Sequence, residues 1–310
     1  MILNILYCFD NNYNFQAFTS MASLLDSSSQ KLNFFIIHKS KHNDNFIPSY
    51  IRMHKNLNKI EIKTFNIETS FPNVKRSHVS EATYYRFYFD KIFKIKSDHL
   101  IYLDSDIICK RDPSKIFIES INNIKKSNYI IGAKTENIRS ENNKVFFERI
   151  NLNSNKYFNA GVIIIDTEKW VNMFISEKII NKLKINKLKL SFWDQDLLNM
   201  FFDGNYLEID ENLNFKVFLN KHYKKQNIES AMLLHFTGKE KPWNQKGIFS
   251  EYSKLYQNNF RKISNKKFHI NHTSKIDAIK KLVLSIKNKT FFLIDHKFVF
   301  LNQYFKSFLA

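Results

Sequence analysis

Two carboxylates placed two residues apart directly follow an apolar run. Asp104-Ser105-Asp106 comes after residues 100–103, so in an extended or turning backbone both carboxylates can reach one hard cation. Mg²⁺ and Mn²⁺ take oxygen ligands of this kind and also bind phosphates. The same spacing recurs at Asp194 and Asp196, and solvated turn carboxylates are the alternative interpretation. The apolar run ahead of Asp104 favours a metal site there.

An imidazole and a basic loop lie together later in the chain. His235 ends a short apolar run before Thr237-Gly238, where it could supply a nitrogen ligand that suits Mn²⁺ better than Mg²⁺. A purely structural histidine is the alternative. Lys239 and Lys241 follow, and their ammonium groups beside exposed backbone N–H groups would form a cradle for a diphosphate.

Alternating strand and helix patterns predict the α/β fold that positions these residues. Apolar runs predict strands at 2–7, 32–38, 60–65, 99–103, 129–133, 162–166 and 233–236. Helical periodicity predicts helices at 14–25, 80–93, 170–184 and 194–202. In a largely parallel sheet, ligands bind beyond the carboxyl ends of the strands. Asp10 and Asp104 both fall at such ends, which indicates where the chemistry lies.

Six segments, in this order, resemble glycosyltransferase family 8, the retaining enzymes that include bacterial lipopolysaccharide α-galactosyl- and α-glucosyltransferases and glycogenin. The resemblance covers roughly residues 1–245 and implies a single GT-A domain, the Rossmann-like fold of nucleotide-diphospho-sugar transferases. The segments are Asp10-Asn11-Asn12-Tyr13, Thr83-Tyr84-Tyr85-Arg86, Leu100 to Asp106, Tyr157-Phe158-Asn159-Ala160-Gly161-Val162, Trp193-Asp194-Gln195-Asp196-Leu197-Leu198-Asn199, and His235-Phe236-Thr237-Gly238 through Lys241-Pro242-Trp243.

The resemblance implies a role for each matching residue. The metal, Mn²⁺ or Mg²⁺, would be bound by Asp104, Asp106 and His235 and would bridge both phosphates of a UDP-hexose donor. The donor itself would be bound by four groups: Asp10, Asn12 and Tyr13 at the uridine, Ser105 at the ribose, Gly238 and Lys241 at the diphosphate, and Arg86, Asn159, Asp194 and Gln195 at the sugar. An ordinary surface cation is the alternative for Arg86, and a turn residue is the alternative for Asn159.

Retention of the anomeric configuration is implied by the same resemblance, and two routes to it stay open. Same-face attack would let the leaving phosphate take the acceptor proton, with Gln195 and Asp194 as the catalytic residues that orient and stabilise. Double displacement would need a nucleophile below the ring. Gln195 is the neighbour there, but a neutral amide is a poor nucleophile, so we favour same-face attack. Galactose and glucose remain equally possible as the transferred hexose.

The positive charge of the chain is concentrated at its end. The net charge is +19, and residues 261–310 contain eleven Lys or Arg against Asp277 and Asp295. We therefore divide the chain into a GT-A domain at 1–255 and a basic amphipathic region at 256–310. Lysines interleave there with apolar segments at 276–286, 291–294 and 298–308, a pattern that favours docking on an anionic membrane surface. Nucleic-acid binding and simple completion of the core are the alternatives, and we expect no nucleic-acid partner.

Cys8 and Cys109 lie in apolar runs, so we expect buried, reduced thiols and a reducing compartment. The N-terminus lacks the basic region of a secretory signal, and no apolar run approaches the length of a membrane span. These features predict a cytoplasmic protein that is peripheral on the inner face of the cytoplasmic membrane. Its acceptor would be a lipid-anchored oligosaccharide or another glycan.

Two other functions compete with this interpretation. A metal-dependent phosphotransferase or phosphatase would use the Asp-x-Asp pair as nucleophile and acid. That class usually has Thr or Val two residues after the second Asp, where this chain has Ile108, which is tolerable but not diagnostic. The segments assigned to the sugar site would also go unexplained. A non-catalytic basic protein that binds membrane or nucleic acid would leave the intact set of six segments unexplained.

Overall fold

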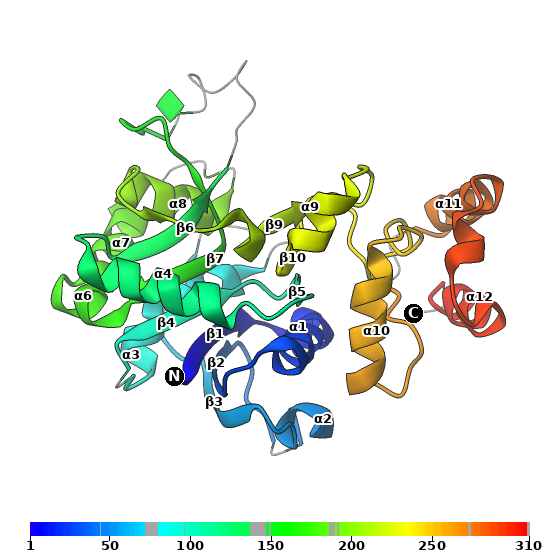
Figure 1. Ribbon diagram of the computed structural model, residues 1–310, viewed down its shortest axis with the longest axis horizontal. Coiled ribbons are helices and arrows are strands. Elements are labelled where there is room, and N and C mark those ends of the chain that lie inside the picture. Colours follow the sequence, from blue (N-terminus) through cyan, green and yellow to red (C-terminus); the bar gives the residue numbers. More distant parts are fainter. Residues whose placement is uncertain are drawn as a thin grey trace.

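Seven strands form the central sheet, in the order β3-β2-β1-β4-β7-β6-β8, and three more form a small second sheet in the order β5-β10-β9 (Figure 1). The computed structural model describes residues 1–43, 45–71, 80–95, 97–136, 147–148, 150–185, 190, 192–271 and 274–308. In sheet order the central strands are Leu57–Thr64, Leu32–His38, Leu3–Phe9, His99–Leu103, Phe158–Asp166, Ile131–Thr135 and Leu207–Glu208. The second sheet comprises Ile107–Cys109, Leu233–Phe236 and Phe215–Val217.

Helices cover both faces of the central sheet and continue into a C-terminal lobe (Figure 1). The α-helices are α1 Asn14–Ser27, α2 Ser49–Arg52, α3 Phe89–Ile92, α4 Ser114–Lys126, α6 Thr167–Asn172, α7 Ile175–Ile185, α8 Trp193–Phe202, α9 Lys225–Ser230, α10 Ser253–Ile263, α11 Lys275–Lys287 and α12 Lys297–Lys306. Short 3-10 helices occur at Asn11–Tyr13, Glu81–Tyr88, Glu211–Leu213 and Thr290–Leu293.

The predicted α/β architecture with a largely parallel sheet is confirmed. Strands β3, β2, β1 and β4 run parallel, whereas β7 lies antiparallel to both β4 and β6. Every residue of β1 is buried. Its Leu6 and Cys8 pack in the apolar cluster on one face of the sheet, and Ile5 and Tyr7 pack in the cluster on the other, as the alternation of side chains along a strand requires. This double burial explains why β1 reads as a continuous apolar run.

Two predicted helices differ from the structure. Residues 80–93 form a 3-10 helix at Glu81–Tyr88 followed by the short α3, with Tyr84, Tyr85 and Phe87 all buried. Residues 170–184 divide into α6 and α7 at Phe174, whose φ of 53° is left-handed. Both predicted cysteine environments are confirmed, since Cys8 and Cys109 are free and buried.

The C-terminal lobe has an apolar core of its own, made of Ile248, Phe249, Phe268, Ala278, Leu282, Phe291, Ile294, Phe300 and Tyr304. It is tied to the chain just before it. The Tyr304 hydroxyl donates to the carbonyl oxygens of Ala278, at 2.9 Å, and Gln245, at 3.3 Å, and Gln245 Nε2 donates to Ser307 Oγ at 3.0 Å. Several aromatic residues of the 256–310 region therefore pack in a core, as the core alternative required, but this core belongs to the lobe and not to the central sheet.

The proposed boundary at residue 255 falls inside α10. That helix packs on the main body, where Phe260 contacts Phe15 edge to face and Lys262 pairs with Asp26 at 2.6 Å. The division into 1–255 and 256–310 stays a prediction. In the part of the chain that the structure describes, no helix combines the length and apolar character needed to cross a membrane.

Helix α8, which carries Asp194 and Gln195, is fixed to β7 by one buried amide. Asn199 Oδ1 accepts from the backbone N–H of Phe158 at 2.7 Å, and Asn199 Nδ2 donates to the carbonyl oxygens of Phe158 and Gln195, both at 2.9 Å. Asn199 is fully buried. The Asn199 side chain thus attaches α8 directly to the backbone of β7.

We predict that Asn199→Leu lowers the free energy of unfolding by about 2–4 kcal/mol, because it leaves buried backbone groups of Phe158 without partners. Equilibrium denaturant unfolding measures this loss. The exposed Asn172→Ala on α6 is the control and should change stability by less than about 0.5 kcal/mol. Equal stability of the two variants would contradict the role given to Asn199.

Candidate active site

Asp104-Ser105-Asp106 forms the corner at which the chain leaves one sheet and enters the other. Strand β4 ends at Leu103, the Asp104 N–H donates to the Gly161 carbonyl oxygen at 2.9 Å, and β5 begins one residue after Asp106. Strand β10 pairs antiparallel with β5, with His235 opposite Ile107. This pairing brings an imidazole that is 130 residues away in sequence next to the two carboxylates.

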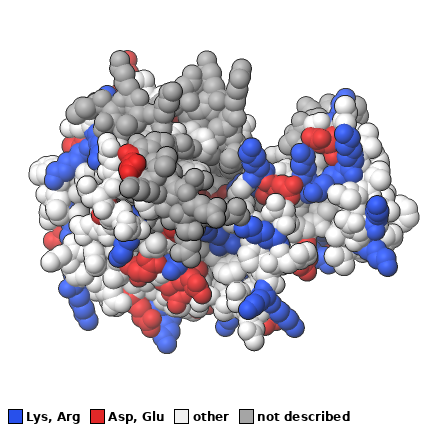
Figure 2. All heavy atoms as spheres, turned by 90° about the horizontal axis from the view of Figure 1, so that it is seen from above, with Lys and Arg blue, Asp and Glu red and all other residues white. Residues whose placement is uncertain are grey.

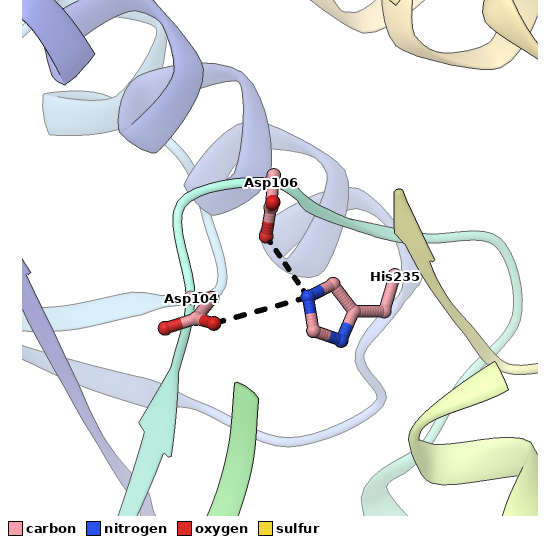
Figure 3. A group of neighbouring side chains, drawn as sticks. All are labelled: Asp104, Asp106 and His235. Atoms are coloured by element: carbon pink, nitrogen blue, oxygen red, sulfur yellow. Dashed lines mark ion pairs between the residues drawn. The ribbon is translucent and has the colours of Figure 1, made fainter. Parts of the chain in front are cut away.

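The three side chains converge on one point (Figure 3). His235 Nε2 lies 3.2 Å from Asp106 Oδ1 and 3.8 Å from Asp104 Oδ2, and one ligand atom from each residue lies within 4.8 Å of the others. Asp106 Oδ1 is buried and makes no hydrogen bond of good geometry to any described residue. Two carboxylate oxygens and one imidazole nitrogen are a donor set that fits Mn²⁺.

Gly161 is the reason that His235 can approach so closely. A Cβ built on Gly161 would lie 2.3 Å from His235 Cε1, so any larger residue would displace the ring. The glycine of the Asn159-Ala160-Gly161 segment thus makes room for a metal ligand.

Lys241 supplies a positive charge to the same carboxylate. Its Nζ donates to Asp106 Oδ2 at 2.7 Å and to the carbonyl oxygen of Phe236. Burial alone would raise the pKa of Asp106, but the neighbouring Lys241 and His235 hold that pKa well below its usual range. Asp106 is therefore ionised, and the Lys241 ammonium lies beside the three candidate metal ligands.

Arg86 joins the candidate metal site to the start of α8. Its Nη2 lies 3.1 Å from both Asp104 Oδ1 and Asp194 Oδ2, and its guanidinium stacks 3.5 Å from the centre of the Tyr102 ring. The Tyr102 hydroxyl donates to Asp104 Oδ1 at 2.6 Å. Arg86 is 5% exposed, so the alternative of an ordinary surface cation is wrong.

The two carboxylates of the Asp194-Gln195-Asp196 segment have different environments. Burial raises the pKa of Asp194 to about 6, against the opposing effect of Arg86. Asp196 accepts hydrogen bonds from the Tyr157 hydroxyl at 2.7 Å and the Phe192 N–H at 3.0 Å. Asp194 lines the cleft, while Asp196 fixes the start of α8.

Gln195 and Asn159 hold each other at the wall of the cleft. Gln195 Oε1 accepts from the Ala160 N–H at 3.0 Å and from Asn159 Nδ2 at 3.2 Å. Both in-plane lone pairs of that oxygen are thus engaged, which makes it an oriented group and an even poorer nucleophile than a free amide.

Nearly all of the predicted residues line one cleft. The predicted members of its lining are Tyr13, Arg86, Asp104, Ser105, Asp106, Asn159, Asp194, Gln195, His235, Gly238 and Lys241. Asp10 and Asn12 are not part of this lining: Asp10 Oδ1 accepts from the Asn12 N–H at 3.0 Å and so caps the 3-10 turn that presents Tyr13. Gly238 has a φ of 85°, a left-handed conformation that favours glycine.

Sequence reasoning missed several residues of the site. Phe192, Trp193 and Thr237 also line the cleft, and the buried Thr237 Oγ1 makes no hydrogen bond to a described residue. Asn214, the residue just before β9, contacts His235, with 2.9 Å between Asn214 Oδ1 and His235 Nδ1. Thr237 lies within a recognised segment and could have been found there, but no local pattern marks Asn214.

We predict that Lys241→Met strengthens the binding of Mn²⁺ in the absence of nucleotide by about tenfold or more, because the ammonium no longer competes for Asp106. The same change should weaken the binding of UDP, since a cation is lost from the loop that we expect to bind the diphosphate. Electron paramagnetic resonance of free Mn²⁺ measures the first effect, and calorimetry the second. Lys115→Met, at an exposed position on α4 outside the cleft lining, removes the same charge and should alter neither. Weaker Mn²⁺ binding by Lys241→Met would contradict the competition.

Comparisons with known proteins agree with this geometry. Residues 4–247 match the family model described as glycosyl transferase family 8. A lipopolysaccharide 1,2-glucosyltransferase of Escherichia coli strain K12 is 27% identical, over 80% of this chain and 74% of its own length. A lipopolysaccharide 1,3-galactosyltransferase of Salmonella typhimurium is 28% identical, over 79% of this chain and 74% of its own.

Among solved structures, the galactosyltransferase LgtC in complex with donor and acceptor sugar analogs has the same fold. Its TM-score is 0.66 at 19% identity, and the match covers 91% of this chain and all of LgtC. This similarity confirms the predicted GT-A fold. The family model spans both sheets and every residue of the cleft described above, and the chain therefore belongs to glycosyl transferase family 8.

Proposed function

We propose that this protein is a retaining, Mn²⁺-dependent hexosyltransferase. It transfers galactose or glucose from a UDP-sugar to a saccharide acceptor in the synthesis of lipopolysaccharide, lipooligosaccharide or another cell-surface glycan. The observation that carries the proposal is the convergence of Asp104, Asp106 and His235 with Lys241 in one cleft. Relatives named as lipopolysaccharide glucosyl- and galactosyltransferases support the donor and acceptor classes.

The diphosphate end of the cleft suits stabilisation of a leaving group. When bound to Asp104, Asp106 and His235, Mn²⁺ would neutralise charge on the two phosphates as the anomeric bond breaks. Lys241 contributes a second cation beside the same position, and a preorganised charge of this kind is usually the largest catalytic term. The left-handed turn at Gly238 brings backbone close to the phosphates, while Tyr13 offers its ring to the uracil.

The sugar end of the cleft suits stabilisation of an oxocarbenium-like ring. With a pKa of about 6, Asp194 is mainly ionised at neutral pH and places a negative charge where positive charge develops. Gln195 is held by the Ala160 N–H and by Asn159, which supports an orienting role and same-face attack. A phosphotransferase in which Asp104 is the nucleophile is disfavoured, because Arg86 and Tyr102 both engage Asp104 Oδ1.

We predict that one UDP-hexose, galactose or glucose, is slowly hydrolysed by the purified protein with Mn²⁺ and that EDTA abolishes this reaction. A panel of UDP-sugars with detection of released UDP tests the prediction. Asp106→Asn, which removes the negative charge of one ligand and leaves Lys241 without its anionic partner, should reduce turnover by about 100-fold or more. Failure of every UDP-sugar to bind or react, with turnover of a generic phosphate ester, would overturn the proposed function.

The surface of the C-terminal lobe suits attachment to an anionic membrane. Large apolar side chains stand exposed on α11, α12 and the turn between them, among them Val283, Phe292 and Phe298, the last 90% exposed. Lysines lie between them, and Figure 2 shows basic side chains spread over the lobe, on the right, with few acidic ones. We propose that the lobe docks at the inner face of the cytoplasmic membrane, where a lipid-anchored acceptor would be presented.

We predict that Phe298→Glu reduces binding to vesicles of phosphatidylglycerol and phosphatidylethanolamine by about tenfold or more, because it removes an inserting ring and adds a negative charge. Cosedimentation measures the bound fraction. Met53→Glu is the matched control, since Met53 directly follows α2 and is 84% exposed, away from the lobe. Equal binding by both variants, or no binding by the wild type, would contradict membrane docking.

A further inference from the structure

Four hydrogen bonds run in a single direction from the metal site to the far side of the sugar site. They connect His235, Asn214, Asn159, Gln195 and Glu136. The successive separations are 2.9 Å from His235 Nδ1 to Asn214 Oδ1, 3.0 Å from Asn214 Nδ2 to Asn159 Oδ1, 3.2 Å from Asn159 Nδ2 to Gln195 Oε1, and 3.2 Å from Gln195 Nε2 to Glu136 Oε2. Three side-chain amides thus lie in series between an imidazole and a carboxylate.

The direction of the series is fixed by groups that can act in only one way. A backbone N–H can only donate, and the Gly161 N–H donates to Asn159 Oδ1 while the Ala160 N–H donates to Gln195 Oε1, both at 3.0 Å. An ionised carboxylate can only accept, so Glu136 requires the NH₂ group of Gln195. The amides of Asn159 and Gln195 therefore cannot be flipped without the loss of two hydrogen bonds each.

The fixed amides determine the state of the next two groups. Because Asn159 Oδ1 requires a donor, Asn214 must turn its NH₂ group toward it and its Oδ1 toward His235. The His235 Nδ1 then carries a hydrogen, which leaves Nε2, the nitrogen that faces Asp106, as the atom available to a metal. A neutral imidazole that donates from one nitrogen and offers the other is the form that binds a metal.

The strand that follows Asn214 closes the series at its other end. Strand β9 begins at Phe215 and pairs with β10, with Lys216 opposite His235. The Lys216 Nζ donates to Glu136 Oε1 at 2.5 Å, so it neutralises the carboxylate that ends the series. One short stretch of chain thus contacts both the first and the last members.

We propose that Asn214 is a positioning residue shared by the metal site and the donor-sugar site. Through its oxygen it selects the metal-binding tautomer of His235, and through its NH₂ group it holds Asn159 and, through Asn159, Gln195. It is 4% exposed and does not line the cleft, so it acts through these neighbours. The sugar half of this statement rests on the proposed function, but the metal half does not.

The wild-type protein provides the first test. The ¹⁵N shifts and N–H couplings of the His235 ring, assigned with a His235→Gln variant, should show a hydrogen on Nδ1. A ring that carries its only hydrogen on Nε2 would overturn the proposal without any substitution at Asn214.

Two substitutions at Asn214 then separate its two contacts. Asn214→Leu keeps the branched shape and removes both contacts, so Mn²⁺ alone should bind about 10–100-fold more weakly, by electron paramagnetic resonance. Asn214→Asp keeps an acceptor for His235 but opposes Asn159 Oδ1 with a second acceptor. It should retain Mn²⁺ affinity while kcat for the preferred UDP-sugar falls about tenfold or more with little change in the Mn²⁺ requirement.

Asn58→Leu, an exposed asparagine on the edge strand β3, is the control and should leave both measurements unchanged. Wild-type affinity for Mn²⁺ in Asn214→Leu would overturn the proposal. Parallel loss of Mn²⁺ binding in the Asp and Leu variants would overturn it as well. Wild-type turnover tests the proposed function separately, because the ring shifts and the Mn²⁺ titrations need no donor.

Discussion

Compensation of buried negative charge is the constraint on which this structure depends. Asp104, Asp106 and Asp194 are gathered in one cleft, and an unpaired carboxylate in such a place is costly. Arg86 lies between Asp104 and Asp194, and Lys241 lies against Asp106. Two cations against three carboxylates leave a single net negative charge. A divalent cation bound there would reverse that sign, and a positive cleft would suit the diphosphate of the proposed donor. The ion pair with Lys241 keeps Asp106 ionised before any metal binds.

The second sheet brings the compensating groups to the carboxylates. Strand β5 follows Asp106 directly, and its pairing with β10 places His235 and the Lys241 loop beside the strand end of β4. Glycine at position 161 lets the imidazole approach to contact distance. On the opposite wall, the buried amide of Asn199 holds α8, so that Asp194 faces Arg86. The pairing of β5 with β10 in the second sheet thus positions the candidate metal ligands. The contact of α8 with β7 in the central sheet positions Asp194 beside Arg86.

Much of this could be predicted from the sequence, for reasons that the structure makes plain. Strands β1, β2 and β4 are buried on both faces, so they appear in the sequence as nearly unbroken apolar runs. The end of the run that forms β4 marked Asp104 as a candidate site residue. Strand direction is not encoded in such runs, and the antiparallel β7 could not be read from its residues. The 3-10 helix at Glu81–Tyr88 and the break at Phe174 depend on tertiary packing. Asn214 and Glu136 act only through partners that are distant in sequence, so no local pattern identifies them.

The attachment of the C-terminal lobe has a consequence for how the enzyme would meet its acceptor. Tyr304 and Ser307 hold Gln245, four residues beyond Lys241, and the lobe core includes Ile248 and Phe249. The lobe is thus held against the segment that directly follows Lys241, at one end of the cleft. An acceptor on any surface that the lobe contacted would therefore be presented at a fixed distance from Asp104, Asp106 and His235.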